Sequence, residues 1–191
     1  MSRFFGAAEH AAFVVPDFDA TVNRLIEAGI GPVFTMRRIR VPARFRGERH
    51  DPLFSAAFVY TGAMQYEFIA QHDDTPSGYK EFLERKPEGG MHHTAYFAPQ
   101  GFDAALADAK AQGTEFTIVQ EFIDPTGTAY EIYVEPTGSA DPLLAQLMIA
   151  GPMEPFFKEM ERIAASWDGS EPERDALKMI PPGMVPPTEP A

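Results

Sequence analysis

Two histidines stand at matching places in two similar stretches of the sequence. His10 opens the stretch HAAFVVPDFDATVNRLIEAGI, and His93 is the second histidine of HHTAYFAPQGFDAALADAKAQGT. With these histidines aligned, the Phe-Asp-Ala at 18–20 matches the Phe-Asp-Ala at 102–104 after a one-residue insertion. The alignment selects His93 over its neighbour His92, so the repeat makes His10 and His93 equivalent.

A glutamate stands near the end of each repeated unit, Glu67 in the sequence YEF and Glu131 in the sequence YEI. A carboxylate between apolar neighbours on a strand is costly unless it is paired or bound to a metal. If the two units form one curved sheet, four equivalent side chains can converge on one point. These are His10, Glu67, His93 and Glu131. Two imidazoles and two carboxylates suit a divalent ion such as Zn, Ni, Co, Fe or Mn.

Each of these residues also has an ordinary structural explanation. A lone strand glutamate usually faces solvent, and a lone strand histidine is more often a satisfied core or surface group. The symmetry of the two His–Glu pairs favours the metal site. The remaining histidines, His50, His72 and His92, are assigned no role in it.

The elements that must position these residues follow the repeat. Each unit begins with an apolar strand that ends at a proline, continues with a helix that ends at a glycine, and then adds β-rich runs. We expect an α+β domain over 1–137, with one unit at 8–72 and a shorter one at 91–137. Between them, 73–90 is expected to form a linker with one short helix capped by Ser77.

Beyond residue 137 the composition changes. Residues 138–180 are expected to form a helical extension with a break at the Gly-Pro of 151–152, packed on the sheet or on a partner subunit. Residues 181–191 form a proline-rich tail, which is typical of an extended or disordered segment.

The overall composition excludes several classes of protein. The chain has 191 residues, of which 45% are hydrophobic, so a single domain with a sizeable core is expected. Without cysteine, any metal must be held by nitrogen and oxygen. The net charge of −12 argues against nucleic-acid binding. No apolar run of about 18 residues and no leader peptide are evident, so a cytoplasmic protein without a membrane span is expected.

Basic residues are concentrated in one segment, 37–49, which contains six arginines. Charged residues on a strand edge block unwanted pairing, which is the ordinary explanation. The alternative is a clamp for a substrate carboxylate or phosphate, because guanidinium groups match such anions. The candidates for this clamp are Arg37, Arg38, Arg40 and Arg44, with Arg46 and Arg49 nearby. Aromatic residues, Phe58, Tyr60 and Tyr96, are candidates for an apolar pocket wall.

The order of these motifs resembles a known superfamily. Tandem units that open with H-x-x-x-x-V-P-D and close with Glu and a hydrophobic residue resemble the vicinal oxygen chelate superfamily, over roughly 8–136. This superfamily includes glyoxalase I, methylmalonyl-CoA epimerase, extradiol dioxygenases and bleomycin-resistance proteins. The stretches AFVYTGAMQYEFIAQ and GGMHHTAYF most resemble the glyoxalase and epimerase branch. The resemblance implies two tandem βαβββ modules in a curved mixed sheet.

The resemblance also implies a function. The ligands carried over are His10, Glu67, His93 and Glu131, around a divalent metal with open positions. Such a site implies an isomerase, epimerase or lyase acting by proton transfer next to a carbonyl, through a metal-chelated enolate. Glu131, in preference to Glu67, would move the proton. The partners expected are a small-molecule substrate, anionic or a thioester, and a second copy of the chain in a homodimer.

Two alternatives stay open. An Fe(II) extradiol-type dioxygenase uses two histidines and one carboxylate, and the second glutamate counts against it. A metal-free, resistance-type binding protein would lack the ligands, and the presence of all four counts against that function.

Overall fold

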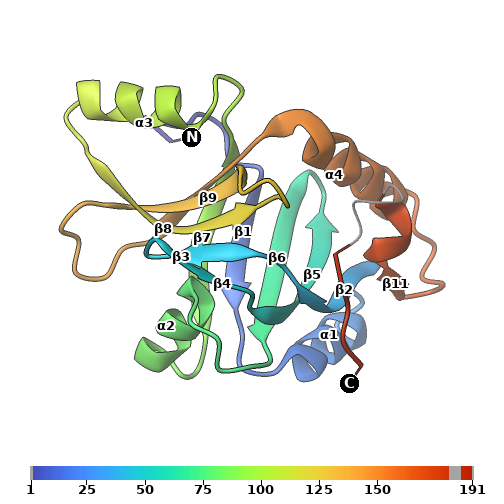
Figure 1. Ribbon diagram of the computed structural model, residues 1–191. Coiled ribbons are helices and arrows are strands. Elements are labelled where there is room, and N and C mark those ends of the chain that lie inside the picture. The colour runs from blue at the N-terminus through green and yellow to red at the C-terminus, as the bar shows by residue number, and fades with distance from the viewer. Residues whose placement is uncertain (1, 181–185, 191) are drawn as a thin grey trace.

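The computed structural model describes residues 2–180 and 186–190. Its strands form one mixed sheet of eleven strands, and helices lie around the sheet (Figure 1). The strand order is β11-β2-β5-β6-β1-β7-β10-β9-β8-β3-β4. The predicted α+β class with a curved mixed sheet is confirmed.

The first unit has the predicted order of one strand, one helix and further strands. Its main elements are β1 (His10–Val14), α1 (Phe18–Glu27), β2 (Val33–Arg40), β5 (Leu53–Thr61) and β6 (Met64–Gln71). The helix begins where Asp17 accepts a hydrogen bond from the backbone N–H of Ala20, and it buries Phe18 and Val22. A small hairpin, β3 (Ala43–Phe45) and β4 (Glu48–His50), is inserted between β2 and β5.

This hairpin makes the sheet strongly curved. Strand β2 lies next to one end of the strand order, whereas β3 lies near the other end and pairs with β8. Only residues 41–42 connect β2 to β3. The two ends of the sheet must therefore approach each other, so the sheet is curved (Figure 1).

The second unit repeats the pattern. It consists of β7 (Gly90–Phe97), α3 (Phe102–Ala111), β8 (Phe116–Ile123), β9 (Ala129–Pro136) and β10 (Leu144–Met148). Its last strand lies in the segment for which a helix is predicted. That prediction is wrong for 144–148, because the short apolar run LAQLM is buried between β7 and β9 and hydrophobic periodicity cannot distinguish such a strand from a helix.

The linker helix agrees with prediction. Helix α2 (Gly78–Arg85) begins where Ser77 accepts a hydrogen bond from the backbone N–H of Lys80. It buries Tyr79 and Phe82, so it is part of the core rather than an exposed spacer.

The C-terminal extension packs on the same molecule. Helix α4 (Ala150–Ala165) runs without the expected break at 151–152 and crosses beside β5 (Figure 1). Its residues Phe156, Phe157 and Met160 are buried. It is followed by β11 (Glu173–Asp175) and the 3-10 helix η1 (Ala176–Met179).

Of the predicted proline-rich tail, residues 181–185 and 191 lie outside the described residues. The described part is attached to β2, because Thr188 bridges to Ile39 and the backbone N–H of Glu189 donates to the carbonyl of Arg38.

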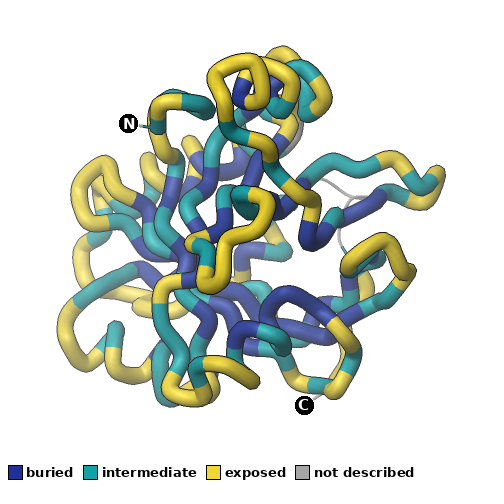
Figure 2. The backbone as a smooth tube through the Cα atoms, turned by 90° about the vertical axis from the view of Figure 1, so that its left-hand side faces the viewer, coloured by how far each residue is buried: buried dark blue, intermediate teal, exposed yellow. Residues whose placement is uncertain are grey.

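Burial follows the sheet. The strands carry most of the buried positions and the connecting turns are exposed (Figure 2). Within 2–180 and 186–190, no helix has both the length and the apolar character needed to cross a membrane.

Candidate metal centre

Three of the four predicted ligands meet at the centre of the sheet. His10 Nε2 lies 3.2 Å from Glu67 Oε2, and His93 Nε2 lies 3.5 Å from the same oxygen. All three residues are buried, and the ligand atoms lie within 4.8 Å of one another. The predicted convergence of His10, Glu67 and His93 is therefore present.

Strand pairing explains the convergence. Strand β1 lies between β6 and β7, and Ala12 pairs with Glu67 on one side and with His93 on the other. His10 points the same way as Ala12, because alternate residues of a strand share a face. The methyl group of Ala12 leaves room for the larger side chains on both sides.

The electrostatics of the three residues suit a bound cation. Burial alone would raise the pKa of Glu67, but the close approach of His10 and His93 outweighs it and lowers that pKa to about 2. Burial lowers the pKa of His93 below its ordinary value, against the opposing effect of Glu67. Glu67 is therefore a carboxylate and His93 favours the neutral form, which are the states that ligate a metal.

The buried polar atoms also fit a metal. Although His10 Nε2 and Glu67 Oε2 lie 3.2 Å apart, their geometry is not that of a hydrogen bond, and neither these atoms nor His10 Nδ1 form one with any described residue. Buried polar atoms of this kind are costly without a partner. A divalent ion held by imidazole nitrogen and carboxylate oxygen would satisfy Glu67 Oε2 and one nitrogen of His10, and the donor set matches the predicted Zn, Ni, Co, Mn or Fe.

The fourth position is occupied by a residue that the sequence analysis missed. Gln146 stands on β10 two residues after Leu144, the pairing partner of His93. Glu67 stands on β6 two residues after Gln65, the pairing partner of His10. Gln146 is thus the counterpart of Glu67, and its Oε1 lies 3.1 Å from His93 Nε2.

The predicted equivalence of Glu131 with Glu67 is therefore wrong. Glu131 lies on β9, one strand further from β7, and its carboxylate accepts a hydrogen bond from Nε2 of Gln146. The similarity between YEF and YEI pairs Glu67 with a residue of the third strand of the second unit, whereas its structural counterpart lies on the fourth strand, β10. The polar residue inside the apolar run LAQLM is the signal that could have revealed Gln146.

The pKa of the Glu131 carboxyl is raised above its ordinary value. Burial raises its pKa to about 8, the charge of Glu67 adds to the effect, and a hydrogen bond from Tyr133 opposes it. The structure places Glu131 outside the group formed by His10, Glu67 and His93. Its roles as a metal ligand and as a proton carrier stay predictions.

His92 is also part of the centre, although the sequence analysis assigned it no role. The pairing of β1 with β7 steps from Ala12–His93 to Phe13–Met91, which makes His92 the extra residue of a β-bulge. The bulge turns both histidines inward, and their Nδ1 atoms lie 2.9 Å apart. Burial lowers the pKa of His92 well below its ordinary value, so it is neutral.

The arginines of 37–49 lie elsewhere and pair mostly with carboxylates of the chain itself. Arg37 pairs with Asp19 and Glu173, Arg40 with Asp73 and Glu189, Arg44 with Glu121, Arg46 with Glu81, and Arg49 with Asp51. Arg38 has no ion pair among the described residues. The substrate clamp stays a prediction.

The two candidate pocket tyrosines are separated. The Tyr60 hydroxyl donates to the backbone carbonyl of Phe157, which places Tyr60 beside α4. Tyr96 packs against Phe5, 5.6 Å between ring centroids, in the separate apolar cluster that includes residues of α3.

The sequence over residues 9–130 matches the family described as Glyoxalase/Bleomycin resistance protein/Dioxygenase superfamily. The chain therefore belongs to this superfamily, which confirms the predicted resemblance. No curated protein matches the sequence.

Solved structures are similar to this chain at low sequence identity. Methylmalonyl-CoA epimerase from Mycobacterium tuberculosis is 18% identical with a TM-score of 0.52, over 81% of this chain and 95% of that one. A single-residue variant of methylmalonyl-CoA epimerase from Streptomyces coelicolor, in complex with 2-nitronate-propionyl-CoA, is 17% identical with a TM-score of 0.48, over 77% and 96%. A mutant of 4-hydroxymandelate synthase from Streptomyces coelicolor is 13% identical with a TM-score of 0.47, over 76% and 49%.

Proposed function

We propose that this chain is a divalent-metal-dependent enzyme that moves a proton next to a carbonyl, as an isomerase, epimerase or lyase. The observation that carries the proposal is the buried group of His10, Glu67 and His93, whose ligand atoms lie within 4.8 Å of one another. These residues would hold the metal, with the amide oxygen of Gln146 as a fourth donor. A bound divalent ion supplies Lewis acidity, which lowers the pKa of a carbon acid next to a carbonyl.

The chain supplies the group that handles the proton. With a pKa raised to about 8, Glu131 can both carry a proton and release it near neutral pH. Glu67, with a pKa lowered to about 2, stays ionised and is suited to hold charge rather than to move a proton. Glu131 is therefore the better candidate for the proton carrier, and Gln146 orients its carboxyl through a hydrogen bond.

The first test is the metal content of protein purified without a metal-binding tag, compared with His93→Ala. We expect about one equivalent of Zn, Ni, Co or Mn per chain in the wild type and a large loss in the variant. The matched control is His50→Ala, which changes a histidine outside the centre. Wild-type protein that neither contains nor takes up a divalent metal would refute the proposal.

The second test concerns Glu131. Deuterium exchange from solvent can be followed in a panel of 2-oxo acids, hydroxy-ketones and methylmalonyl-CoA. We expect Glu131→Gln to keep its metal and to lose exchange by a factor of about 10²–10⁴, the usual contribution of a general acid or base. Unchanged exchange in Glu131→Gln would remove this residue from the reaction.

An Fe(II) dioxygenase is the second candidate. If the Gln146 amide fills the fourth position, the remaining donors are two histidines and one carboxylate, the set used by non-haem Fe(II) oxygenases. Iron in the purified protein together with oxygen uptake on a catechol would favour this candidate. The cytoplasmic location, the homodimer and an anionic or thioester substrate stay predictions.

A further inference from the structure

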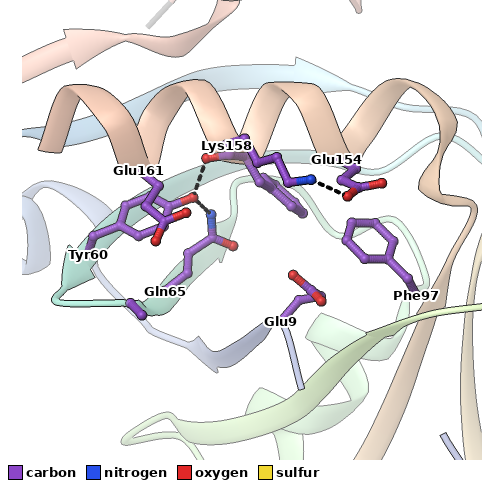
Figure 3. A pocket seen from close by; sticks show the side chains of 9 residues that line it. Glu9, Tyr60, Gln65, Phe97, Glu154, Lys158 and Glu161 are labelled. Atoms are coloured by element: carbon purple, nitrogen blue, oxygen red, sulfur yellow. Dashed lines mark hydrogen bonds and ion pairs between the residues drawn. The ribbon is translucent and has the colours of Figure 1, made fainter. Parts of the chain in front are cut away.

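A cavity of about 170 Å³ lies between α4 and the ends of β5 and β6 (Figure 3). It adjoins the metal centre. Gln65, in its wall, pairs with His10 and stands two residues before Glu67 on the same face of β6. Phe157, also in the wall, has its ring centroid 5.7 Å from that of His10. Phe157 therefore lies against both the cavity and His10.

The orientation of the Gln65 amide follows from its hydrogen bonds. The single proton of the Tyr60 hydroxyl goes to the carbonyl of Phe157, at 2.8 Å. The same hydroxyl must then accept from Gln65, whose Nε2 lies 2.5 Å away. The amide oxygen has no hydrogen-bond partner within 2–180 and 186–190, although Gln65 is only 2% exposed. Figure 3 shows this oxygen directed into the space between Glu9 and Lys158.

The charge around the cavity is negative. Its wall carries the carboxylates of Glu9, Glu154 and Glu161 and one ammonium group, that of Lys158. Lys158 pairs with Glu154, which leaves two carboxylates without an ion pair among the described residues. Together with the unpartnered amide oxygen, the wall offers acceptors to a group that brings hydrogen-bond donors and positive charge.

The aromatic side chains of the wall indicate that this group is an organic cation. Phe97 and Phe157 lie in the wall with ring centroids 6.4 Å apart. Aromatic faces attract organic cations and accommodate the aliphatic carbons next to an ammonium group. A phosphate or carboxylate would instead meet like charge from the glutamates.

We propose that this cavity is the outer part of the substrate site and binds a protonated amine carried by the substrate. The inference rests on the proposed function in taking His10, Glu67 and His93 as the reacting end, with Phe157 turning aside as the substrate enters. It names the substrate class as small amines that carry a carbonyl group. It disfavours coenzyme A thioesters, whose phosphates are anionic.

The test uses three probes of matched size: butylammonium, butanol and butyrate. Binding is followed by ligand-observed NMR with the full-length protein, first metal-free and then loaded with Mn²⁺. We expect butylammonium to bind more tightly than the other two, and Mn²⁺ to enhance the relaxation of its protons because the cavity adjoins the metal centre. Equal or tighter binding of butyrate would overturn the inference, and so would butylammonium binding without relaxation enhancement in protein that has bound Mn²⁺.

Substitutions in the cavity wall are expected to change butylammonium affinity in opposite directions. Glu161→Gln and Gln65→Leu should each weaken butylammonium binding about threefold, as expected for a partly exposed charge or a single hydrogen bond. Lys158→Met should strengthen binding because it removes the competing ammonium group. Glu27→Gln, an exposed glutamate of α1, is the control and should change nothing. Identical affinities in all four variants would contradict the proposal.

Different results would refute the metal-dependent enzyme and the amine subsite. Protein that binds Mn²⁺ but does not prefer butylammonium would leave the metal enzyme in place and remove the amine subsite. Protein that prefers butylammonium in the metal-free state but takes up no metal would remove the proposed enzyme, and the cavity would then be an amine-binding site without a reacting metal.

Discussion

The two repeated units present the same geometry with different chemistry. In the first, β1 and β6 pair in parallel and place His10 beside Glu67. In the second, β7 and β10 pair in parallel with the same offset and place His93 beside Gln146. The first unit thus contributes a carboxylate to the centre, and the second contributes a neutral amide at the equivalent place.

The difference separates two tasks that carboxylates perform. Glu67 is ionised, with a pKa lowered to about 2, while Glu131 of the second unit has a pKa raised to about 8. Two carboxyl groups whose environments move their pKa values apart are typical of an acid–base site. Under the proposed function, the first unit would supply the charge that holds a metal, and the second would supply a proton carrier next to a neutral amide.

The largest effect on metal affinity is expected from a substitution that gives both units an amide at the equivalent position. In Glu67→Gln the centre loses its single ionised carboxylate, so we expect zinc affinity to fall more than about 100-fold, beyond the 10–100-fold typical of outer-shell changes. Titration calorimetry with Zn²⁺ measures this. Glu27→Gln is the control, and an affinity within a few fold of the wild type would show that Glu67 does not hold the metal.

Exchanging the two residues tests the register directly. The double variant Glu67→Gln with Gln146→Glu restores one carboxylate and one amide in swapped positions. We expect the double variant to bind zinc at least tenfold more tightly than Glu67→Gln alone, because paired residues in one network are strongly coupled. Calorimetry on the single and double variants forms the cycle, and additive losses would contradict the equivalence of the two positions.

An intermediate effect on zinc affinity is expected from the β-bulge of β7, which lies where β7 pairs with β1. A neutral His92 can accept a hydrogen bond from Nδ1 of His93, which orients the His93 ring and leaves its Nε2 free for the metal. We expect His92→Phe to lower zinc affinity 10–100-fold while the protein stays folded. Circular dichroism checks the fold; unchanged affinity in a folded variant would leave His92 as a packing residue only.

The smallest effect concerns how each unit ends. Strand β6 is followed by Asp73, which bonds Arg40 and Thr75, whereas β10 leads directly into α4. Burial would raise the pKa of Asp73, but hydrogen bonds from Thr75, Arg40 and the backbone outweigh it and lower that pKa. We expect Asp73→Asn to cost about 1–2 kcal/mol of stability at neutral pH.

The pH dependence of this effect has a definite sign. A carboxyl with a lowered folded pKa stabilises the protein above its unfolded pKa of about 4, and loses that contribution as the pH falls through the folded value. Urea unfolding at several pH values should therefore show the difference between wild type and Asp73→Asn shrinking below pH of about 4. A constant difference would mean that the charge of Asp73 is not the cause.

Much of the fold was predictable because it depends on local patterns. The matched segments after His10 and His93 located both first strands and both helices, and Ser77 marked the start of α2. The last strand of the second unit was not predictable in this way. A five-residue apolar run becomes a strand only because β7 and β9 are there to pair with it.

The sequence by itself determined the repeat, the resemblance to the superfamily and the three residues His10, Glu67 and His93, since these can be recognised from side-chain types and from matching segments. The tertiary structure alone decided that Gln146 takes the place expected for Glu131, and that a β-bulge brings His92 inward. It also decided that most of the clustered arginines pair within the chain, and it formed an acidic cavity from segments far apart in sequence. Strand register, bulges and ion pairs depend on contacts between distant residues, which local patterns do not encode.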